Sequence, residues 1–261
     1  MDGRVRVSLL RQTADPEIAV ALAARLCYSP DRIEDLERGA DAAGAAALIR
    51  RIVALGHVSV LEHAVFTFGI EGISRAASHQ LVRHRVASYS QQSQRYVAAG
   101  ADFEHVVPPA VAARADLSRI FARAMRDAGR RYRELLAAGV AAEDARFVLP
   151  NAAATRIIVT MNARELRHFF SLRCCQRAQW EIRALAELML GLARGAAPML
   201  FEGCGPSCVV GPCPEGKLSC GRLSRVRKAY RSWAPGLERP PLSEAPATGQ
   251  PSSAARRRKA P

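Results

Sequence analysis

Residues 83–96 read RHRVASYSQQSQRY and form the most polar stretch between two apolar-patterned parts of the chain. Only Val86 and Ala87 are apolar, so this segment has little to bury. Guanidinium groups held close together repel one another unless an anion lies among them, and the arginine fork matches phosphate oxygens in paired hydrogen bonds. A charged helix face that runs into a solvated loop is the ordinary explanation of such a run. The interleaved aromatic, hydroxyl and amide side chains favour a ligand-binding segment instead.

The hydrophobic spacing on either side of this segment predicts a single α+β domain. Alternating or β-branched residues predict strands at 5–10, 65–70 and 155–161. Helical spacing is found at 16–27, 42–55, 74–84, 117–136, 164–172 and 178–194. We expect one domain over residues 1–235, with a small, mostly antiparallel sheet packed by long helices. The Pro-, Ala-, Ser- and Arg-rich residues 236–261 predict a disordered basic tail.

The charge balance is strongly basic, with 38 Lys and Arg against 24 Asp and Glu and a net charge of +14. Such an excess is common in nucleic-acid-binding proteins. Here the basic residues are dispersed, apart from residues 256–259, and aromatic residues make up only 6%, which is poor for stacking on bases. Anionic small molecules would use the same arginines. No apolar run is long enough to span a bilayer and residues 1–6 do not look like a secretory signal, so we expect a cytoplasmic protein.

A second polar cluster occupies residues 56–63, which read GHVSVLEH. His57, Glu62 and His63 are residue types that bind metals, but their spacing is not that of a zincin helix. A loop in which Glu62 and one imidazole pair with each other explains the same residues without a metal.

The chain has seven cysteines, and an odd number without a secretory signal argues against a disulfide framework. Four of them, Cys204, Cys208, Cys213 and Cys220, lie within seventeen residues rich in Gly and Pro. Four thiolates in a compact loop could bind a structural Zn²⁺ or an iron–sulfur cluster. Free thiols are the alternative, because the spacing is not the usual pair of Cys-x-x-Cys knuckles.

Three separated motifs resemble those of one enzyme family, the flavin-dependent thymidylate synthases. In its signature Arg-His-Arg is followed at fixed offsets by two serines and Arg-Tyr, as in Arg83, His84, Arg85, Ser88, Ser93, Arg95 and Tyr96. Residues 56–63 are similar to the upstream motif of the family. Residues 145–150, 162–164, 168 and 172–173 are similar to its downstream half. The resemblance extends over roughly residues 5–200.

The resemblance implies a reaction and its partners. The family makes dTMP from dUMP by reductive methylation without a cysteine nucleophile. Methylenetetrahydrofolate donates the carbon, and FAD reduced by NADPH supplies the hydride. The family members are homotetramers whose sites are shared between subunits, so dUMP and the folate would be the small-molecule partners here.

The resemblance also implies roles for individual residues. Arg173 is the expected catalytic residue, because a guanidinium stabilises the anion that forms when uracil loses its N3 proton. The positions that match dUMP-binding residues are Gln80, Arg83, Gln91, Gln92, Ser93, Gln94, Arg95, Arg146 and Arg173. The positions that match FAD-binding residues are Ser59, Arg83, His84, Arg85, Gln91, Asn162, Arg164 and His168.

The chain departs from the family pattern at three positions. Ser90 replaces a frequent Asn, Gln91 replaces a common Glu, and Arg177 stands where many members have a His. Gln91 carries no charge, so an acid–base role at this position does not carry over from the resemblance. Two other hypotheses are a basic nucleic-acid-binding protein with a zinc module and an inactive relative that keeps the fold. The enzyme predicts a yellow protein, whereas a nucleic-acid binder predicts a colourless one whose binding depends strongly on salt.

Overall fold

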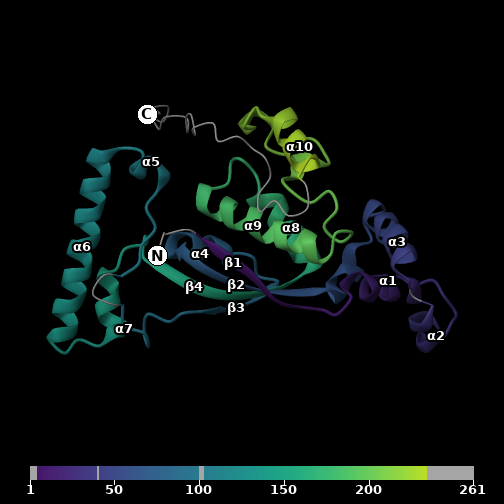
Figure 1. The fold of residues 1–261 in the computed structure, drawn as a ribbon, viewed down its shortest axis with the longest axis horizontal. Helices are drawn as coiled ribbons and strands as arrows, with labels where there is room; N and C mark the ends of the chain where they lie inside the picture. Colours follow the sequence, from purple (N-terminus) through teal and green to yellow (C-terminus); the bar gives the residue numbers. More distant parts are fainter. Residues whose placement is uncertain (1–4, 40, 100–102, 234–261) are drawn as a thin grey trace, which may run out of the picture.

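The computed structural model describes residues 5–39, 41–99 and 103–233. The predicted tail at 236–261 and the last two residues of the predicted domain lie outside these ranges. The centre of the fold is one four-stranded antiparallel sheet with the strand order β1-β2-β4-β3 (Figure 1). Its strands are β1 (Arg6–Gln12), β2 (Val65–Ser74), β3 (Ala87–Gln91) and β4 (Ala154–Asn162).

The two central strands supply one buried face of the sheet. Phe66 pairs with Met161, Phe68 with Val159 and Ile70 with Ile157, and all six side chains are buried. The period-2 alternation that predicted these strands follows from the pleat, which sends successive side chains to opposite faces. The α+β sheet is therefore confirmed. The hydrophobic spacing did not predict strand β3, because its residues are too polar to show an apolar face.

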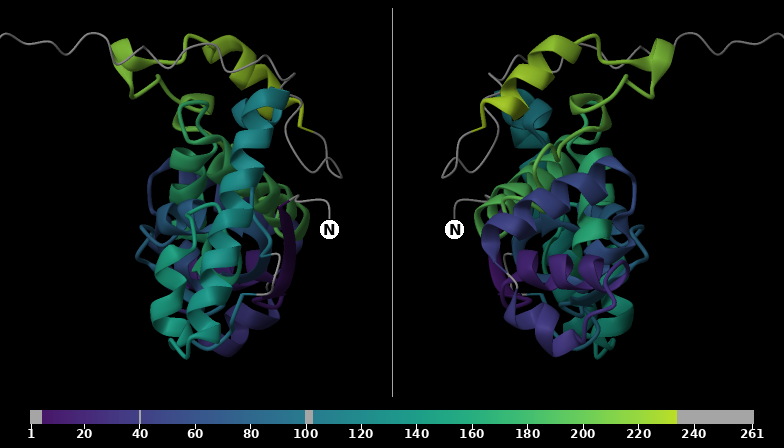
Figure 2. Two further views of the ribbon diagram at one scale, coloured as in Figure 1. Left: turned by 90° about the vertical axis from the view of Figure 1, so that its left-hand side faces the viewer. Right: turned by 90° about the vertical axis from the view of Figure 1, so that its right-hand side faces the viewer.

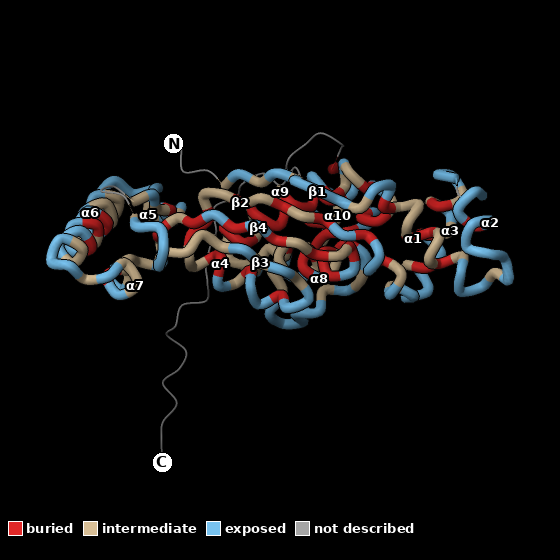
Figure 3. Tube along the Cα trace, turned by 90° about the horizontal axis from the view of Figure 1, so that it is seen from below, coloured by how far each residue is buried: buried red, intermediate tan, exposed pale blue. Residues whose placement is uncertain are grey.

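Helices cover the buried face of the sheet (Figures 1 and 3). They are α4 (Arg75–Leu81), α8 (Ala163–Arg173) and α9 (Trp180–Ala196). Phe169 and Phe170 on α8 and Leu185 on α9 are fully buried in the core that they form with the sheet. Burial of each such side chain stabilises the fold by about 1.5–3 kcal/mol.

The remaining helices extend the molecule beyond both ends of the sheet (Figures 1 and 2). One end carries α1 (Pro16–Leu26), α2 (Ile33–Arg38) and α3 (Ala42–Ala54), and the other carries α5 (Pro109–Ala112), α6 (Ala115–Ala137) and α7 (Ala142–Ala145). Within the described residues, four short 3₁₀ segments connect elements: η1 (Val58–His63), η2 (Arg146–Val148), η3 (Ser207–Val209) and η4 (Gly216–Leu218). The last described helix is α10 (Leu223–Arg231). In none of the described ranges is there a helix with the length and apolar character needed to cross a membrane.

The second face of the sheet is not covered by other described parts of the chain. Ile158 lies in the middle of the central strand β4, yet 46% of it is exposed, and Leu10 on β1 is 39% exposed. The hydroxyls of Thr67 and Thr160 lie 2.9 Å apart between the two central strands of this sheet. We refer to this surface as the open sheet face.

Candidate functional site

The Arg-His-Arg segment forms a turn between α4 and β3. The side chain of Ser74 caps α4 by accepting a hydrogen bond of 3.0 Å from the backbone N–H of Ala77. At the other end, the Tyr89 hydroxyl lies 2.9 Å from the carbonyl oxygen of Leu81 and 2.8 Å from that of His84, and it ties the turn to β3. The turn leaves Arg83 and Arg85 exposed, whereas His84 between them is buried.

His84 connects Arg173 to a buried carboxylate. Nε of Arg173 donates to Nε2 of His84 at 3.1 Å, and Nδ1 of His84 lies 3.0 Å from Oε1 of Glu165. An imidazole that accepts at Nε2 carries its proton on Nδ1 and donates it to the carboxylate. Burial lowers the pKa of His84, and the nearby Arg173 lowers it further against the opposing influence of Glu165. His84 is therefore a neutral acceptor that orients the Arg173 guanidinium.

Arg173 is fixed by a second contact as well. Its Nη2 donates to the carbonyl oxygen of Gln80 at 3.3 Å. Burial lowers the pKa of Arg173, but a guanidinium with an ordinary pKa above 12 stays charged. The predicted catalytic residue therefore presents a partly buried positive charge beside the signature turn.

His168 lies next to this network. Its ring centroid is 5.8 Å from that of His84, and ligand atoms of His84, Glu165 and His168 all lie within 4.8 Å of one another. A metal would need the ring nitrogens of His84, but both are already engaged with Arg173 and Glu165. We interpret the group as a hydrogen-bonded support for Arg173. His84 was predicted to bind FAD, and in this arrangement its ring has no nitrogen left for a ligand.

The lowered pKa of His84 predicts a pH dependence of stability. Below the usual value of about 6.5, the unfolded chain takes up a proton that folded His84 resists. The contribution of neutral His84 to the stability of the folded state is therefore complete above about pH 6.5, and it is lost as the pH falls toward the folded-state pKa of His84. We expect the melting temperature to fall more steeply from about pH 6.5 to 5 in the wild type than in His84→Gln, whose amide does not titrate. His79→Gln, at an exposed position, is the control. Parallel curves for wild type and His84→Gln would contradict this role.

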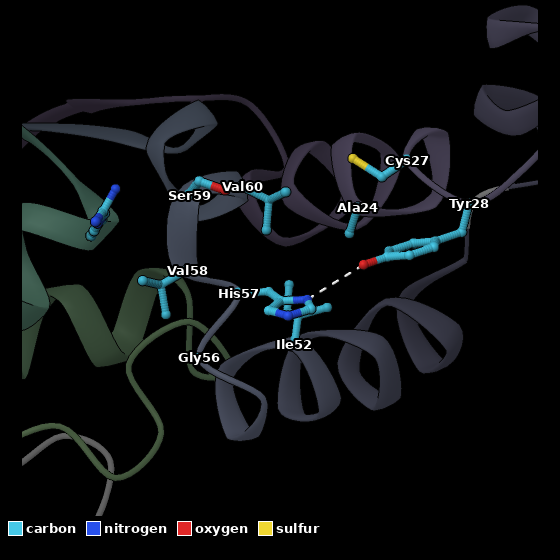
Figure 4. Close-up of a pocket in the computed structure, with 10 residues that line it drawn as sticks. Ala24, Cys27, Tyr28, Ile52, Gly56, His57, Val58, Ser59 and Val60 are labelled. Carbon is cyan, nitrogen blue, oxygen red and sulfur yellow. Dashed lines mark hydrogen bonds between the residues drawn. The ribbon is translucent and has the colours of Figure 1, made fainter.

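A cavity of about 370 Å³ lies beside η1 (Figure 4). Ser59 and Arg164, both predicted FAD-binding residues, line it together. Its other lining residues are Ala24, Cys27, Tyr28, Ile52, Gly56, His57, Val58 and Val60. The cavity thus combines apolar walls with a hydroxyl and a guanidinium. Of the eight predicted FAD-binding residues, only these two line it.

The expected pairing of Glu62 with an imidazole is wrong. Oε1 of Glu62 accepts a hydrogen bond of 2.5 Å from Arg164, and His57 instead has its Nδ1 3.4 Å from the Tyr28 hydroxyl. The physical reason is that the first turn of α8 packs against η1 and brings a permanent cation to Glu62. Asn162 caps this turn by accepting from the backbone N–H of Glu165 at 2.9 Å.

The predicted dUMP residues that follow β3 lie along a second cavity of about 230 Å³. Gln92, Ser93 and Gln94 line it together with residues 153–156 of the β4 region. The backbone N–H of Gln92 donates to the carbonyl oxygen of Arg156 at 2.9 Å, and Ser93 Oγ accepts from the backbone N–H of Arg95 at 3.1 Å. These bonds hold the loop at the end of the sheet.

Arg95 and Arg146 meet at Glu143, the second residue of α7. Arg95 forms an ion pair with the Glu143 carboxylate, and Nε of Arg146 donates to the Glu143 carbonyl oxygen at 2.9 Å. Arg75 is also near, since burial and then the charge of Arg146 lower the pKa of Arg75. Arg75 was not among the residues predicted from the sequence to bind a ligand, although it lies only eight residues before Arg83 of the signature. Three guanidiniums near one another, of which only that of Arg95 pairs with the Glu143 carboxylate, make this region suited to an anion.

Gln91 is held inside the fold by neutral partners. Its Nε2 lies 3.0 Å from Ser78 Oγ and 3.2 Å from Thr155 Oγ1. An amide donates to these hydroxyls, whereas the carboxylate common at this position in the family would accept from them. The substitution therefore reverses the sense of the hydrogen bonds and removes a charge.

The comparisons with known proteins agree with one another. The family model described as "Thymidylate synthase complementing protein" matches residues 8–199. A flavin-dependent thymidylate synthase from Geobacter sulfurreducens is 60% identical over 228 residues, which are 87% of this chain and 98% of the relative. One from Clostridium tetani is 45% identical over 242 residues, covering 87% of this chain and 97% of the relative. Among solved structures, the UMP/dUMP methylase PolB from Streptomyces cacaoi bound with 5-Br dUMP has a TM-score of 0.68 and 30% identity, and the match covers 76% of this chain and 93% of that one.

Proposed function

The chain belongs to the flavin-dependent thymidylate synthase family, and from this premise we propose that it methylates dUMP to dTMP. The observation that carries the proposal is the position of Arg173. Its guanidinium is held by His84 and by the Gln80 carbonyl, next to the signature turn. The solved structure with 5-Br dUMP supports a uracil nucleotide as the substrate.

The proposed chemistry needs a positive charge at the uracil ring. Carbon 5 of uracil becomes nucleophilic when the N3 proton is lost, and the resulting anion is stabilised by a fixed cation. Arg173 supplies this cation, and neutral His84 orients it without adding a second charge that the anion would have to share. We propose that no cysteine attacks the substrate, because Arg173 activates the ring without a covalent bond to the protein.

A flavin fits the cavity beside η1. Its volume of about 370 Å³ lies in the range of ligand sites, and its apolar walls suit part of a planar ring system. Ser59 and Arg164 would hold polar groups of FAD, as would Arg83, Arg85, Asn162 and His168 elsewhere on the surface. The bound flavin supplies the hydride of the reaction. We propose NADPH as its reductant and methylenetetrahydrofolate as the carbon donor.

The Arg95–Arg146–Arg75 cluster is the proposed site of the dUMP phosphate. A phosphate carries nearly two negative charges and several acceptor oxygens, which match guanidinium forks better than the single carboxylate of Glu143 does. Ser93 and the loop at Gln92–Gln94 would add hydroxyl and amide contacts. Gln80, Arg83, Gln91 and Arg173 would contact the nucleoside part.

We propose that the functional form is a homotetramer with shared sites. The open sheet face leaves Ile158 and Leu10 exposed, which suits contact with another subunit. The flavin cavity and the second cavity, which Gln92, Ser93 and Gln94 line, also share no lining residue within the described chain. Both facts are explained if each complete site combines residues of several chains.

Subunit mixing tests the shared site. We expect Arg95→Ala and Arg164→Ala to lose most activity separately, since one lacks a phosphate contact and the other a flavin contact. After the two variants exchange subunits, some sites receive both intact residues, so activity should recover to a substantial fraction of wild type. Each variant exchanged with itself is the control. No recovery in verified mixed oligomers would mean that each site forms within one chain.

Tritium release from 5-tritiated dUMP tests the function itself. The purified protein is incubated with FAD, NADPH and methylenetetrahydrofolate, and each component is omitted in turn. Release should require all of them and should be accompanied by dTMP. Release without dTMP formation, or none from a folded protein with bound flavin, would contradict the proposal.

A further inference from the structure

The segment that follows α9 packs against the end of α8, beyond the part of the chain that the family model matches. That match ends at residue 199. Ser207 Oγ donates to the carbonyl oxygen of Ser171 at 3.4 Å, and the Tyr230 hydroxyl donates to that of Cys174 at 3.4 Å. Arg227 donates to the carbonyl oxygens of Cys208 at 2.8 Å and Gly211 at 2.7 Å. These bonds connect η3 and α10 to the end of α8, and Figure 1 shows α10 on the side of α8 and α9 that faces away from the sheet.

The loop at residues 210–222 has no hydrophobic anchor of its own. None of these residues is buried, and its large apolar side chains Val210 and Leu218 are 78% and 62% exposed. Gly216 and Gly221 take left-handed backbone conformations, with φ of 49° and 69°, which allow the tight turns of the loop. Burial of apolar surface therefore does not explain why the loop keeps its shape. Cys213 and Cys220 are among its few half-buried residues.

Four thiols from separate segments lie near one another at this place. Burial raises the pKa of Cys208, and the thiols of Cys175, Cys213 and Cys220 raise it further. Burial likewise raises the pKa of Cys175, with further increases from Cys220, Glu215 and Cys213. Apart from Glu215, the side chains whose charges raise the pKa of these two thiols are thus members of the same group. No arginine or lysine side-chain charge contributes to either shift.

Cys204, which belongs to the cysteine set suggested by the sequence, is left out of the proposed group. It is buried, and its electrostatic neighbours are Arg167 and Arg194. Cys175, which directly follows the C-cap of α8, takes its place. Sequence spacing could not reveal this, because Cys175 precedes the other three by more than thirty residues.

We propose that Cys175, Cys208, Cys213 and Cys220 are the four ligands of a thiophilic metal centre, either a zinc ion or an iron–sulfur cluster. Thiolates prefer these soft metals. Metal binding would release the four thiol protons, and the positive charge of the metal would stabilise the resulting thiolates. The centre would also join the loop covalently to α8, and so provide the anchor that apolar side chains do not.

The first experiment uses the wild-type chain purified without oxygen from cells supplied with iron and zinc. Iron, zinc and acid-labile sulfide are quantified per chain, and cysteines are alkylated before and after acid removal of the metal. We expect about one centre per chain. Iron with sulfide identifies a cluster, and zinc without sulfide identifies a single ion. Peptide mass spectrometry should find Cys175, Cys208, Cys213 and Cys220 protected only while the metal is bound. A metal-free protein, or equal alkylation of these four thiols in both conditions, would overturn the proposal.

Serine variants then test the assignment of the ligands. Cys175→Ser, Cys208→Ser, Cys213→Ser and Cys220→Ser should each lower the metal content at least about tenfold. Cys27→Ser and Cys204→Ser are matched controls that should keep it, with circular dichroism to verify folding. Loss of metal in folded Cys204→Ser, but not in Cys175→Ser, would overturn the ligand set.

Discussion

Arg173→Ala is expected to lower the rate of dTMP formation by about 10²–10³-fold, the usual effect of removing a fixed group that stabilises a developing anion. The structure holds this guanidinium through His84 and Gln80, so its loss removes an oriented charge and not a mobile surface group. The rate should be measured in single turnovers with 5-tritiated dUMP, which separate the chemical step from substrate binding. Bound flavin, followed by its absorbance, should remain at the wild-type level.

Two further variants distinguish charge from geometry at this position. Arg173→Lys keeps the charge but cannot donate to His84 and Gln80 with the same fork, so it should recover only a small part of the rate. Arg177→Ala removes an exposed guanidinium four residues later and should have little effect. If Arg173→Ala formed dTMP at a rate near that of the wild type, the residue would not be the activating group.

Among the substitutions predicted here, Glu181→Ala is expected to lower the free energy of unfolding the most. The Glu181 carboxylate is 2% exposed and accepts hydrogen bonds from the backbone N–H and the hydroxyl of Ser74, both at 2.6 Å. It lies at the N-terminus of α9 and faces that of α4, where helix dipoles favour a negative charge. Alanine leaves two buried donors without an acceptor, at a cost of about 1–3 kcal/mol for each. Denaturant unfolding monitored by circular dichroism measures the change.

The matched variants for this prediction are Glu181→Gln and Glu37→Ala. Glutamine keeps one acceptor oxygen at the same place, so it should lose less stability than alanine. Glu37 is exposed on α2, and its substitution should leave the free energy of unfolding nearly unchanged. Equal unfolding midpoints for wild type and Glu181→Ala would show that Ser74 finds other partners.

The sheet and its covering helices could be predicted because their sequences carry a clear period. Residues 65–70 and 155–161 alternate or are β-branched, and α8 and α9 repeat apolar residues at helical spacing. Strand β3 lacked such a pattern, whereas α10 was not predicted although Val226, Ala229 and Tyr230 recur in it at helical spacing. Their positions depend on tertiary contacts, such as the pairing of Ser90 with Ile158 and the packing of Tyr230 near Cys174.

The candidate site could be predicted as a set of residues but not as an arrangement. Arg83, His84 and Arg85 look equivalent in the sequence, yet the turn exposes the two arginines and buries the histidine. The reason is Glu165, a carboxylate 81 residues away that only the fold brings to His84. The partner of Glu62 was hidden in the same way, as was the place that we propose for Cys175 in the cysteine group.

In the proposed tetramer, the stability of each chain would depend on protein concentration through the open sheet face. If a second subunit covers Ile158 and Leu10, assembly removes folded chains from the unfolding equilibrium, and the apparent stability rises with total protein concentration. A dilute chain would then rely on a sheet with only one covered side. In the proposed tetramer, the surface that completes the site therefore also sets the concentration at which the fold persists.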